Sequence, residues 1–430
     1  MRNIAAYSTY DSYKDSGVEW IGQIPSHWSV KRAGFILEEL SERSKDGSEP
    51  LLSLSKIHGV IRRDSMAERG GQADSLVGYK MVSKDDIVVN RMQASNGLMA
   101  ISRMSGITSP DYAIYRVKRN VPMRADVVAA LLQQVEYQGE IKRRVKGVME
   151  GFIRLYSEDL FRLPLICAPL PEQRAIAVFL DEKCAKLDEA VRIKEQQIAL
   201  LRERRQILIQ QTVTHGLNPV APMKDSGIGW IGQVPAHWEV RRSKYVFTQR
   251  KELARKDDIQ LSATQSYGVI PQEEFEELVG RRVVKIQTNL EKRKRVEIDD
   301  FVISMRSFQG GLERAFATGC IRSSYVILHP LEPVNADFFG YLFKSPRYIK
   351  ALQATGSFIR DGQDLNFDNF SKVDLFLPPL NEQAEIAAHI KTGCEKIDNG
   401  IAIKEEQIAA LKEYKTSLIN AAVTGKIKVI

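Results

Sequence analysis

A heptad pattern of apolar residues constrains the fold of this 430-residue chain more than any other feature of its sequence. The pattern runs through residues 171–214 and returns in register through residues 381–424. Glu, Gln, Lys and Arg fill the other faces of both stretches, which is typical of coiled-coil helices. We therefore predict two helices of about 44 residues, each ~66 Å long at 1.5 Å per residue, that pair with each other.

The predicted seam residues recur at alternating steps of four and three. They are Leu180, Leu187, Val191, Ile198, Leu201 and Leu208 in the first helix, and Ile390, Ile397, Ile401, Ile408, Leu411 and Leu418 in the second. Gly216 and Gly425 follow the last turns as stop signals. Gly393 and Gly400 lie inside the second helix at a cost of roughly 1 kcal/mol each against alanine, so that helix depends on packing. A coiled coil that dimerises two chains is the alternative, but the internal repeat favours pairing within one chain.

A second repeated stretch indicates that the whole chain is a tandem duplication. Residues 14–28 run Lys-Asp-Ser-Gly-Val-Glu-Trp-Ile-Gly-Gln-Ile-Pro-Ser-His-Trp, and residues 224–238 repeat them with few changes. The tracts and the helices share one offset, so the repeating unit is about 210 residues long. The tryptophans, glycines and proline predict a tight turn that docks on a neighbouring element. His27 and His237 have no accompanying nucleophile, so we interpret them as structural.

Between each tract and its helix lies a segment in which the two copies diverge. Short β-rich runs and helical patches predict a mixed α/β domain there in both copies. The expected strands lie near 85–89, 112–114, 299–303 and 325–327, and the helical patches at 125–145 and 336–354. The predicted divisions are a first domain at 1–168, a first long helix at 169–216, a second domain at 217–378, and a second long helix with its tail at 379–430. The repeated tracts and helices form a common framework, whereas the two α/β segments differ. This pattern predicts a protein that binds two different targets.

Composition narrows the function classes. Sixty-two Lys and Arg against 54 Asp and Glu give a net charge of +8, which is compatible with a polyanionic partner. The four cysteines form no CxxC pair and the six histidines are scattered, so we expect no metal site and a reducing compartment. No run approaches the roughly 18 apolar residues of a membrane span, and the first residues lack a signal-peptide core. We expect a cytoplasmic protein.

Catalytic motifs are sparse. Asp111, Glu140 and Lys142 match the loose pattern of a magnesium-dependent nuclease, but the second copy has Ser324 in place of Asp111. The sequence contains no GxxxxGK[ST] loop for ATP and no Asn/Asp-Pro-Pro-aromatic motif for an amino-methyltransferase. We therefore expect no catalysis by this chain and keep the nuclease as an alternative.

The motifs resemble those of one known family. The Trp-Ile-Gly-x-[Ile/Val]-Pro-x-His-Trp tract, the Leu-Pro-Glu-Gln and Leu-Asn-Glu-Gln entries at Leu170 and Leu380, and the Val-Thr-x-Gly helix ends are similar to those of type I restriction-modification specificity subunits. This resemblance covers both halves of the chain. It implies an α/β (α+β) fold with two target-recognition domains and two antiparallel spacer helices. Each domain would bind one half of a split, asymmetric double-stranded DNA sequence.

The resemblance also implies partners. Two modification subunits would methylate adenine N6 with S-adenosylmethionine, and two restriction subunits would translocate and cut DNA with ATP and magnesium. The chain itself would be non-catalytic and hold no cofactor. A stand-alone coiled-coil scaffold, or a bivalent DNA-binding regulator without a methyltransferase, remains the alternative.

The resemblance does not identify the DNA contacts, so we choose them on chemistry. Arginine can bind guanine N7 and O6 through two hydrogen bonds, and Asn or Gln can bind adenine. The predicted base contacts follow an expected strand in each copy: Arg91, Gln93 and Asn96 in the first domain, Arg306 and Gln309 in the second.

Basic clusters are the predicted phosphate contacts. They are Arg62, Arg63, Lys142, Arg143, Arg144 and Lys146 in the first domain, and Arg281, Arg282, Lys292, Arg293, Lys294 and Arg295 in the second. Arg154, Arg360 and Gln363 stand near repeated glycines and are further candidates. A charged run is also what a solvated surface without a ligand would show.

Overall fold

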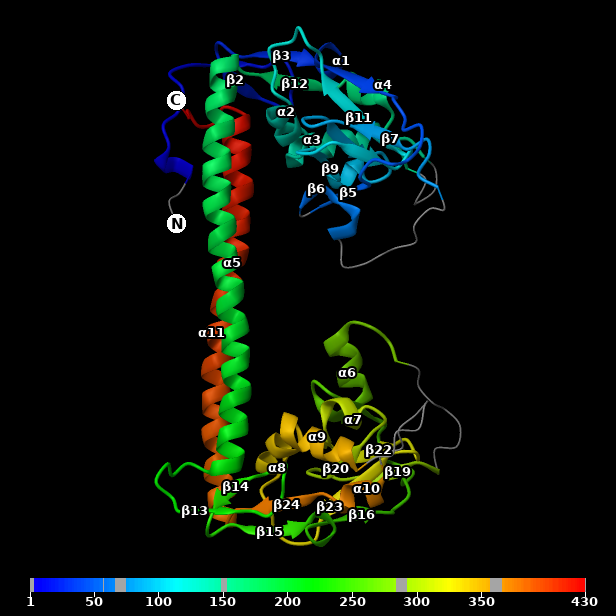
Figure 1. The fold of residues 1–430 in the computed structure, drawn as a ribbon, viewed down its shortest axis with the longest axis vertical. Helices are drawn as coiled ribbons and strands as arrows, with labels where there is room; N and C mark the ends of the chain where they lie inside the picture. The colour runs from blue at the N-terminus through cyan, green and yellow to red at the C-terminus, as the bar shows by residue number, and fades with distance from the viewer. Residues whose placement is uncertain are drawn as a thin grey trace. The chain divides into compact units, whose positions relative to one another are not determined.

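The computed structural model describes residues 4–56, 58–65, 75–147, 153–283, 292–355 and 366–429. The chain forms two compact units. Unit 1 comprises residues 1–194 with 406–430, and unit 2 comprises residues 195–405. Figure 1 shows that each unit combines a mixed helix-and-strand domain with parts of both long helices. Unit 1 is therefore built from two separate stretches of the chain.

The two predicted long helices are α5 (Leu170–His215) and α11 (Leu380–Val423), and they run antiparallel. In unit 1, Lys415 Nζ donates to Asp188 Oδ1 over 2.6 Å. In unit 2, Arg205 and Asp398 lie 3.6 Å apart. The predicted fold class, with a packed pair of long helices, is confirmed.

Burial along the helices follows the heptad. Ile198, Ile390, Ile397 and Leu418 are buried. The other predicted seam residues are half-buried: Leu180, Leu187, Val191, Leu201, Leu208, Ile401, Ile408 and Leu411. Of the two helix glycines, Gly393 has a packing role, because a Cβ there would lie 2.5 Å from Leu208 Cδ2. The glycine lets that leucine approach the α11 backbone, which offsets its low helix propensity.

The domain of each unit contains an antiparallel four-stranded sheet with the same strand order. In unit 1 the order is β4 (Leu37–Leu40), β11 (Tyr112–Val117), β8 (Ile87–Asn90) and β9 (Met99–Ile101). In unit 2 it is β16 (Phe247–Arg250), β23 (Val326–Pro330), β20 (Phe301–Ile303) and β21 (Glu313–Arg314). The duplication seen in the frame thus extends through the divergent segments.

Short strands and helices complete each unit. In unit 1 they are η1 (Ile4–Ala6), β1 (Tyr13–Asp15), β2 (Gln23–Pro25), β3 (Ser29–Arg32), α1 (Ala33–Ile36), β5 (Leu52–Ser55), β6 (Gly59–Arg62), η2 (Arg63–Ser65), β7 (Lys80–Val82), η3 (Ala94–Asn96), β10 (Gly106–Thr108), α2 (Ala125–Leu132), α3 (Val135–Arg144), α4 (Ser157–Phe161) and β12 (Pro164–Cys167). In unit 2 they are β13 (Met223–Asp225), β14 (Gln233–Pro235), β15 (Glu239–Arg242), η4 (Ser243–Tyr245), β17 (Leu261–Thr264), β18 (Gly268–Pro271), α6 (Gln272–Val279), β19 (Lys294–Val296), α7 (Ser307–Gly310), β22 (Gly319–Ile321), α8 (Ala336–Phe343), α9 (Pro346–Ala354), α10 (Phe367–Ser371) and β24 (Asp374–Leu377).

Each predicted helical patch is two helices rather than one. In unit 2, α8 ends before Ser345, whose side chain accepts from Tyr348 N at the start of α9. Pro346 then occupies the first turn, where its missing N–H is not needed. In unit 1, α2 and α3 break at the equivalent place without a side-chain cap on Gln134.

The cores of the two domains differ in chemistry. Among the described residues of unit 2, seven phenylalanines are fully buried: Phe247, Phe301, Phe338, Phe339, Phe343, Phe370 and Phe376. Their positions in unit 1 hold buried aliphatic residues: Leu37, Ile87, Val127, Val128, Leu132, Leu160 and Ile166. At these seven positions, one backbone frame therefore encloses aliphatic side chains in one copy and phenylalanines in the other.

Candidate nucleic-acid interface

The repeated tract of unit 1 docks on a glutamate in the first turn of α5. Glu172 Oε2 accepts from Tyr10 Oη over 2.8 Å and from Trp28 Nε1 over 3.0 Å, while Oε1 lies 2.5 Å from His27 Nε2. Burial raises the pKa of this carboxyl, but the bonds from Trp28, Tyr10 and His27 outweigh it and hold the pKa below its usual value.

Unit 2 repeats this arrangement on α11. Glu382 Oε2 accepts from Trp238 Nε1 over 3.1 Å and lies 2.7 Å from His237 Nε2. The histidines therefore bind a framework carboxylate, in line with their structural interpretation. Sequence reasoning missed both glutamates. The sequence did contain one sign of this contact: the histidine and the glutamate are separated by 145 residues in both copies.

The next residue along each long helix, a glutamine, attaches the domain to the helix. Gln173 Nε2 donates to Pro122 O over 2.9 Å, and its Oε1 accepts from Arg124 N over 2.8 Å. Gln383 Oε1 accepts from Asn335 N over 2.8 Å in the same way. The Glu-Gln pair of each helix therefore holds the tract with one side chain and the domain with the other.

Two equivalent loops leave this frame at the ends of β8 and β20. We name residues 90–97 loop 1 and residues 304–311 loop 2. Asn90 Oδ1 accepts from Met92 N over 3.0 Å, and Ser304 Oγ accepts from Arg306 N over 3.3 Å. Each loop ends at a glycine with a left-handed backbone, at φ +73° for Gly97 and +80° for Gly311.

The predicted base contacts differ in how the loops present them. Gln93 and Asn96 are exposed on loop 1, and Arg306 and Gln309 are exposed on loop 2. Counting from the loop glycines, Arg306 occupies the position of Met92 rather than that of Arg91. Met92 and its loop 2 neighbour Met305 are also exposed, at 43% and 74%. Sequence reasoning missed both methionines, since methionine gave no chemical signal.

Arg91 contacts the protein itself. Its guanidinium pairs with Glu39, whose other carboxylate oxygen accepts from Ser157 Oγ. Ser157 Oγ in turn lies 2.9 Å from Tyr115 Oη. These contacts leave the Arg91 side chain only 24% exposed and tie loop 1 to β4 and α4.

Loop 2 is attached by other groups. Gln265 Nε2 donates to Arg306 O over 3.1 Å, and Gln353 Nε2 donates to Phe308 O over 2.7 Å. Below the loop, Lys344 Nζ donates to the buried Glu313 Oε2 over 2.6 Å. Burial raises the pKa of Glu313 although Lys344 opposes it. The two loops leave equivalent strands, but different side chains fix them, and loop 1 contains a 3-10 helix where loop 2 contains α7.

The unit 1 phosphate candidates lie mostly at the surface. Arg62 pairs with Asp64 over 2.9 Å, and Arg63 Nη1 lies 3.5 Å from Ser53 Oγ. Lys142 and Arg143 are exposed at the end of α3. Two further candidates have acidic partners: Arg144 pairs with Glu140, and Lys146 pairs with Asp159 over 2.8 Å.

The unit 2 candidates divide into exposed and inward-facing groups. Arg281, Arg282 and Lys292 are exposed, although the two arginines follow the acidic helix α6. Arg293 is buried with its guanidinium 4.0 Å from Cys320 Sγ.

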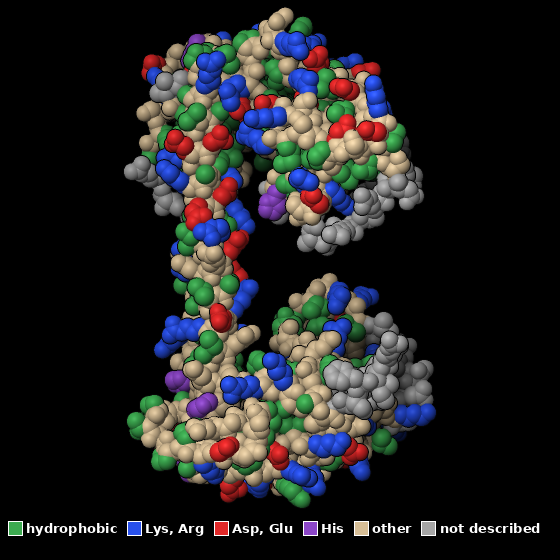
Figure 2. All heavy atoms as spheres, in the orientation of Figure 1, with side chains coloured by type: hydrophobic (Ala, Val, Ile, Leu, Met, Phe, Trp, Pro, Cys, Tyr) green, Lys and Arg blue, Asp and Glu red, His purple; other side chains and the backbone are tan. Residues whose placement is uncertain are grey.

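The next two residues also face the protein. Lys294 Nζ donates to Tyr325 O over 2.6 Å, and burial lowers its pKa. Arg295 pairs with Asp258 over 2.6 Å. On the face shown in Figure 2, basic and acidic side chains are mixed over both units.

The nuclease candidates have cationic neighbours. Asp111 lies 3.8 Å from Arg154, and Glu140 pairs with Arg143 and Arg144, which lower its pKa. Within the described residues, no group of three His, Cys, Asp or Glu side chains is arranged to hold a metal ion. Arg360 and Gln363 lie outside the described residues. In the part of the chain that the structure describes, no helix has the length and apolar character of a membrane span.

Comparisons with known proteins extend over almost the whole chain. No family model matches the sequence. A protein of Methanocaldococcus jannaschii named as the type I restriction enzyme MjaX specificity subunit is 24% identical over 437 aligned residues, covering 95% of this chain and 96% of the relative.

Solved structures have the same fold. A chain from a study of the assembly and conformational transition of the type I R-M system matches with a TM-score of 0.65 at 15% identity, covering 93% of this chain and 98% of the other. The HsdS subunit from Thermoanaerobacter tengcongensis matches with a TM-score of 0.53 at 15% identity, covering 94% and 98%. These comparisons give no support to a stand-alone scaffold or regulator. The chain is therefore similar, over almost its whole length, to a specificity subunit of a type I restriction enzyme, and it shares the fold of an HsdS subunit.

Proposed function

We propose that this chain is the non-catalytic DNA-recognition subunit of a type I restriction-modification complex, with one half-site read by each unit. The observation that supports this most is the duplicated frame. Glu172 and Glu382 hold equivalent tracts, whereas the exposed side chains of loops 1 and 2 differ. A repeated support with two different contact surfaces suits a bipartite, asymmetric target.

The chemistry of the loops suggests a division of labour. Gln93 and Asn96 of loop 1 carry amides, which suit adenine, whereas Arg306 of loop 2 suits guanine O6 and N7. Gln309 is a second amide on loop 2. We assign Arg91 to holding loop 1, because its side chain is only 24% exposed and its guanidinium pairs with Glu39 of β4.

The exposed basic residues are the better phosphate candidates. They are Arg62, Lys142, Arg143, Lys146, Arg281, Arg282 and Lys292. Such contacts position a protein on DNA and make its affinity fall with salt, but they do not select bases. We do not extend this role to Arg293, Lys294 and Arg295, whose charged groups contact the protein.

The long helices supply docking surfaces for partners. Ile193 on α5 and Ile403 on α11 occupy equivalent positions in the two copies and are 41% and 53% exposed. Leu200 is also exposed, at 63%. Apolar side chains at repeated exposed positions fit two copies of one partner, which we propose to be the modification subunit. S-adenosylmethionine, ATP and magnesium would then belong to modification and restriction subunits in the cytoplasm.

A methylation map tests the DNA contacts. The chain is expressed with its modification subunit, and N6-methyladenine is mapped across the genome for the wild type, Arg306→Ala and Lys292→Ala. Loss of a bidentate base contact costs about 1–3 kcal/mol of discrimination, so Arg306→Ala should relax one position of one half-site by ~10- to 100-fold. Lys292→Ala should lower methylation at all sites and relax no base.

Three outcomes contradict parts of the proposal. An unchanged motif in Arg306→Ala removes that arginine from base recognition. A motif altered in both half-sites contradicts the division between the loops. The absence of any motif dependent on the wild-type chain, with the modification subunit present, contradicts the proposed function itself.

A further inference from the structure

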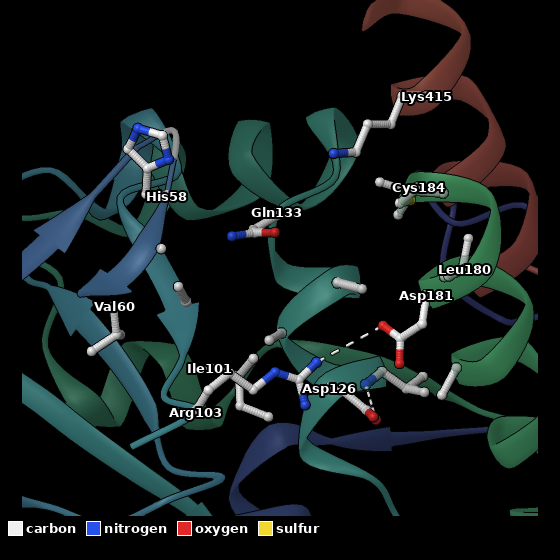
Figure 3. Close-up of a pocket in the computed structure, with 17 residues that line it drawn as sticks. His58, Val60, Ile101, Arg103, Asp126, Gln133, Leu180, Asp181, Cys184 and Lys415 are labelled. Carbon is white, nitrogen blue, oxygen red and sulfur yellow. Dashed lines mark hydrogen bonds and ion pairs between the residues drawn. The ribbon is translucent and has the colours of Figure 1, made fainter. Parts of the chain in front are cut away.

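Unit 1 contains an open cavity of about 430 Å³ between its domain and the long helices. Figure 3 shows that α2 and β9 of the domain form one side, while Leu180 and Cys184 of α5 and Lys415 of α11 form the other. Val127, Leu180 and Ile419 form apolar walls of the cavity. Arg103 and Asp181, which also line the cavity, lie 3.9 Å apart. The cavity therefore combines apolar walls with charged groups.

The duplication shows what fills the equivalent place in unit 2. Helices α2 and α8 have the same length and align from Ala125 and Ala336, which places Ala130 of unit 1 at the position of Tyr341. Ala130 lines the cavity. One copy thus has a methyl group where the other has a phenol.

The surroundings of the phenol match the residues of the cavity. Burial raises the pKa of Tyr341, and the neighbouring Cys394 and Asp337 raise it further, while Arg205 opposes them. The equivalents of these three residues in unit 1 are Cys184, Asp126 and Lys415, and all three line the cavity. Tyr341 therefore lies near the equivalents of three residues that line the unit 1 cavity, where Asp126 pairs with Arg124 and Lys415 pairs with Asp188.

A second substitution widens the cavity. Ile101 on β9 corresponds to Arg314 on β21, because they pair with the equivalent residues Ile87 and Phe301. The Arg314 guanidinium pairs with Asp337 and lies 5.1 Å from the Phe316 ring centroid. In unit 1, Arg124 rather than a β9 residue pairs with the corresponding Asp126, over 2.6 Å. Ile101 and Ala130, which both line the cavity, thus stand where unit 2 has an arginine and a tyrosine.

We propose that the unit 1 cavity is a receptor for a tyrosine side chain carried by a protein partner that docks on α5 and α11. The ring would contact Val127, Leu180 and Ile419, as apolar walls favour an aromatic face. The hydroxyl would reach Asp126 or Lys415, which can accept from it or donate to it. Identification of the partner as the modification subunit rests on the proposed function.

This receptor makes the two units unequal. A partner with one exposed tyrosine fills the unit 1 cavity, whereas Tyr341 of the chain already fills the equivalent place in unit 2. Two identical partner subunits would therefore bind with different affinities, and the tighter one would bind unit 1.

The side-chain analogue 4-methylphenol tests the cavity without any partner. Methyl NMR of the full chain, labelled at alanine and isoleucine, follows Ala100, Ile101 and Ile419 during titration. Saturable shifts at these methyls are expected for the wild type and for Ala130→Ser, which keeps the space open. Ala130→Tyr copies unit 2 and should abolish them, and Tyr341→Ala should create a second set of shifting methyls in unit 2.

Binding in the opened unit 2 of Tyr341→Ala, but not in wild-type unit 1, would overturn the proposal, and so would unchanged binding in Ala130→Tyr. For the partner, titration calorimetry with purified modification subunit should show one of two sites weakened at least tenfold in Ala130→Tyr and unchanged in Ala130→Ser. Equal affinities at both sites in all three proteins would overturn the partner assignment. The proposed function would still stand if the complexes methylate the same motif.

Discussion

The two units of this chain attach their domains to the helices by the same polar contacts but fill the domains with different side chains. Trp28 and Trp238 donate to equivalent glutamates over 3.0 and 3.1 Å. The buried Leu132 of unit 1, however, is replaced in unit 2 by Phe343, whose ring centroid lies 4.9 Å from those of Phe301 and Tyr348. The attachment uses polar bonds between side chains and from the glutamine side chains to the main chain, which do not depend on core volume. The core residues and loops 1 and 2 can therefore differ between the units while the attachment to the helices stays the same.

The electrostatic contacts show the same contrast. Asp85 and Asp299 both have a left-handed backbone, with φ of 71° and 70°, and each precedes a buried aspartate. Asp86 is bound by Arg116 of β11, whereas Asp300 is bound by Arg250 of β16. The turn and the carboxylate are retained, but the cation comes from a different strand. The buried aspartate requires a nearby cation in both units, but that cation can come from different strands.

Core truncation should give the largest effect. Phe343→Ala should cost about 4 kcal/mol and Leu132→Ala about 3 kcal/mol, because each leaves a cavity in a packed cluster. Hydrogen exchange by mass spectrometry, read on peptides of each unit, locates the loss. Loss of protection in both units from either single variant would contradict the independence of the two cores.

The buried ion pair of unit 2 should come next. Lys344→Gln alone leaves Glu313 buried without its cation, at a cost of about 3 kcal/mol. The double variant Glu313→Met with Lys344→Gln removes both charges with side chains of similar volume, and stability should return to within about 1 kcal/mol of the wild type. Urea unfolding of both variants measures this recovery. A double variant as unstable as the single would show that the rest of unit 2 requires the charges.

Breaking the frame should have a smaller and unequal effect. Glu172→Ala removes an acceptor shared by Tyr10, Trp28 and His27 and should cost about 2–3 kcal/mol. Glu382→Ala removes the partner of Trp238 and His237 and should cost about 1–2 kcal/mol. Denaturant titrations compare the pair. A larger loss from Glu382→Ala would contradict the ranking by number of donors.

The smallest effect should be the pH dependence of the free energy of unfolding. The contributions of Glu172 and Glu313 to it should have opposite signs. The pKa of Glu172 is lowered on folding, so its stabilisation is present above the unfolded pKa of about 4.3 and is lost as pH falls through the folded pKa. The pKa of Glu313 is raised, so its contribution is fully present below about 4.3 and is lost as pH rises through the folded pKa.

Unfolding free energies of Glu172→Gln and Glu313→Gln, each compared with the wild type from pH 3 to 7, measure the two contributions. The unfolding free energy of the wild type minus that of Glu172→Gln should decrease as the pH falls. The unfolding free energy of the wild type minus that of Glu313→Gln should increase as the pH falls. The same slope for both pairs would contradict the opposite shifts.

The sequence predicts the long helices well and the contacts of charged residues poorly. Heptads place α5 and α11 to within about one residue, because periodic burial is a local property. The run Lys292–Arg295 suggests a solvated basic surface, but β19 brings Arg295 to Asp258, which is distant in sequence. Arg91 likewise meets Glu39 only through the sheet. Partners of this kind depend on tertiary proximity, which a single sequence does not contain.

The make-up of unit 1 from two distant stretches has a consequence for biosynthesis. Unit 2 is one continuous stretch, so it can fold as soon as residues 195–405 have left the ribosome. Unit 1 lacks part of its core until Leu418, Ala422 and Ile427 have been made, and Tyr13 Oη then donates to Gly425 O over 3.1 Å. The first-made domain is thus the last to be completed. A prematurely terminated chain would expose its apolar face to proteases, which would remove it before it could capture a partner.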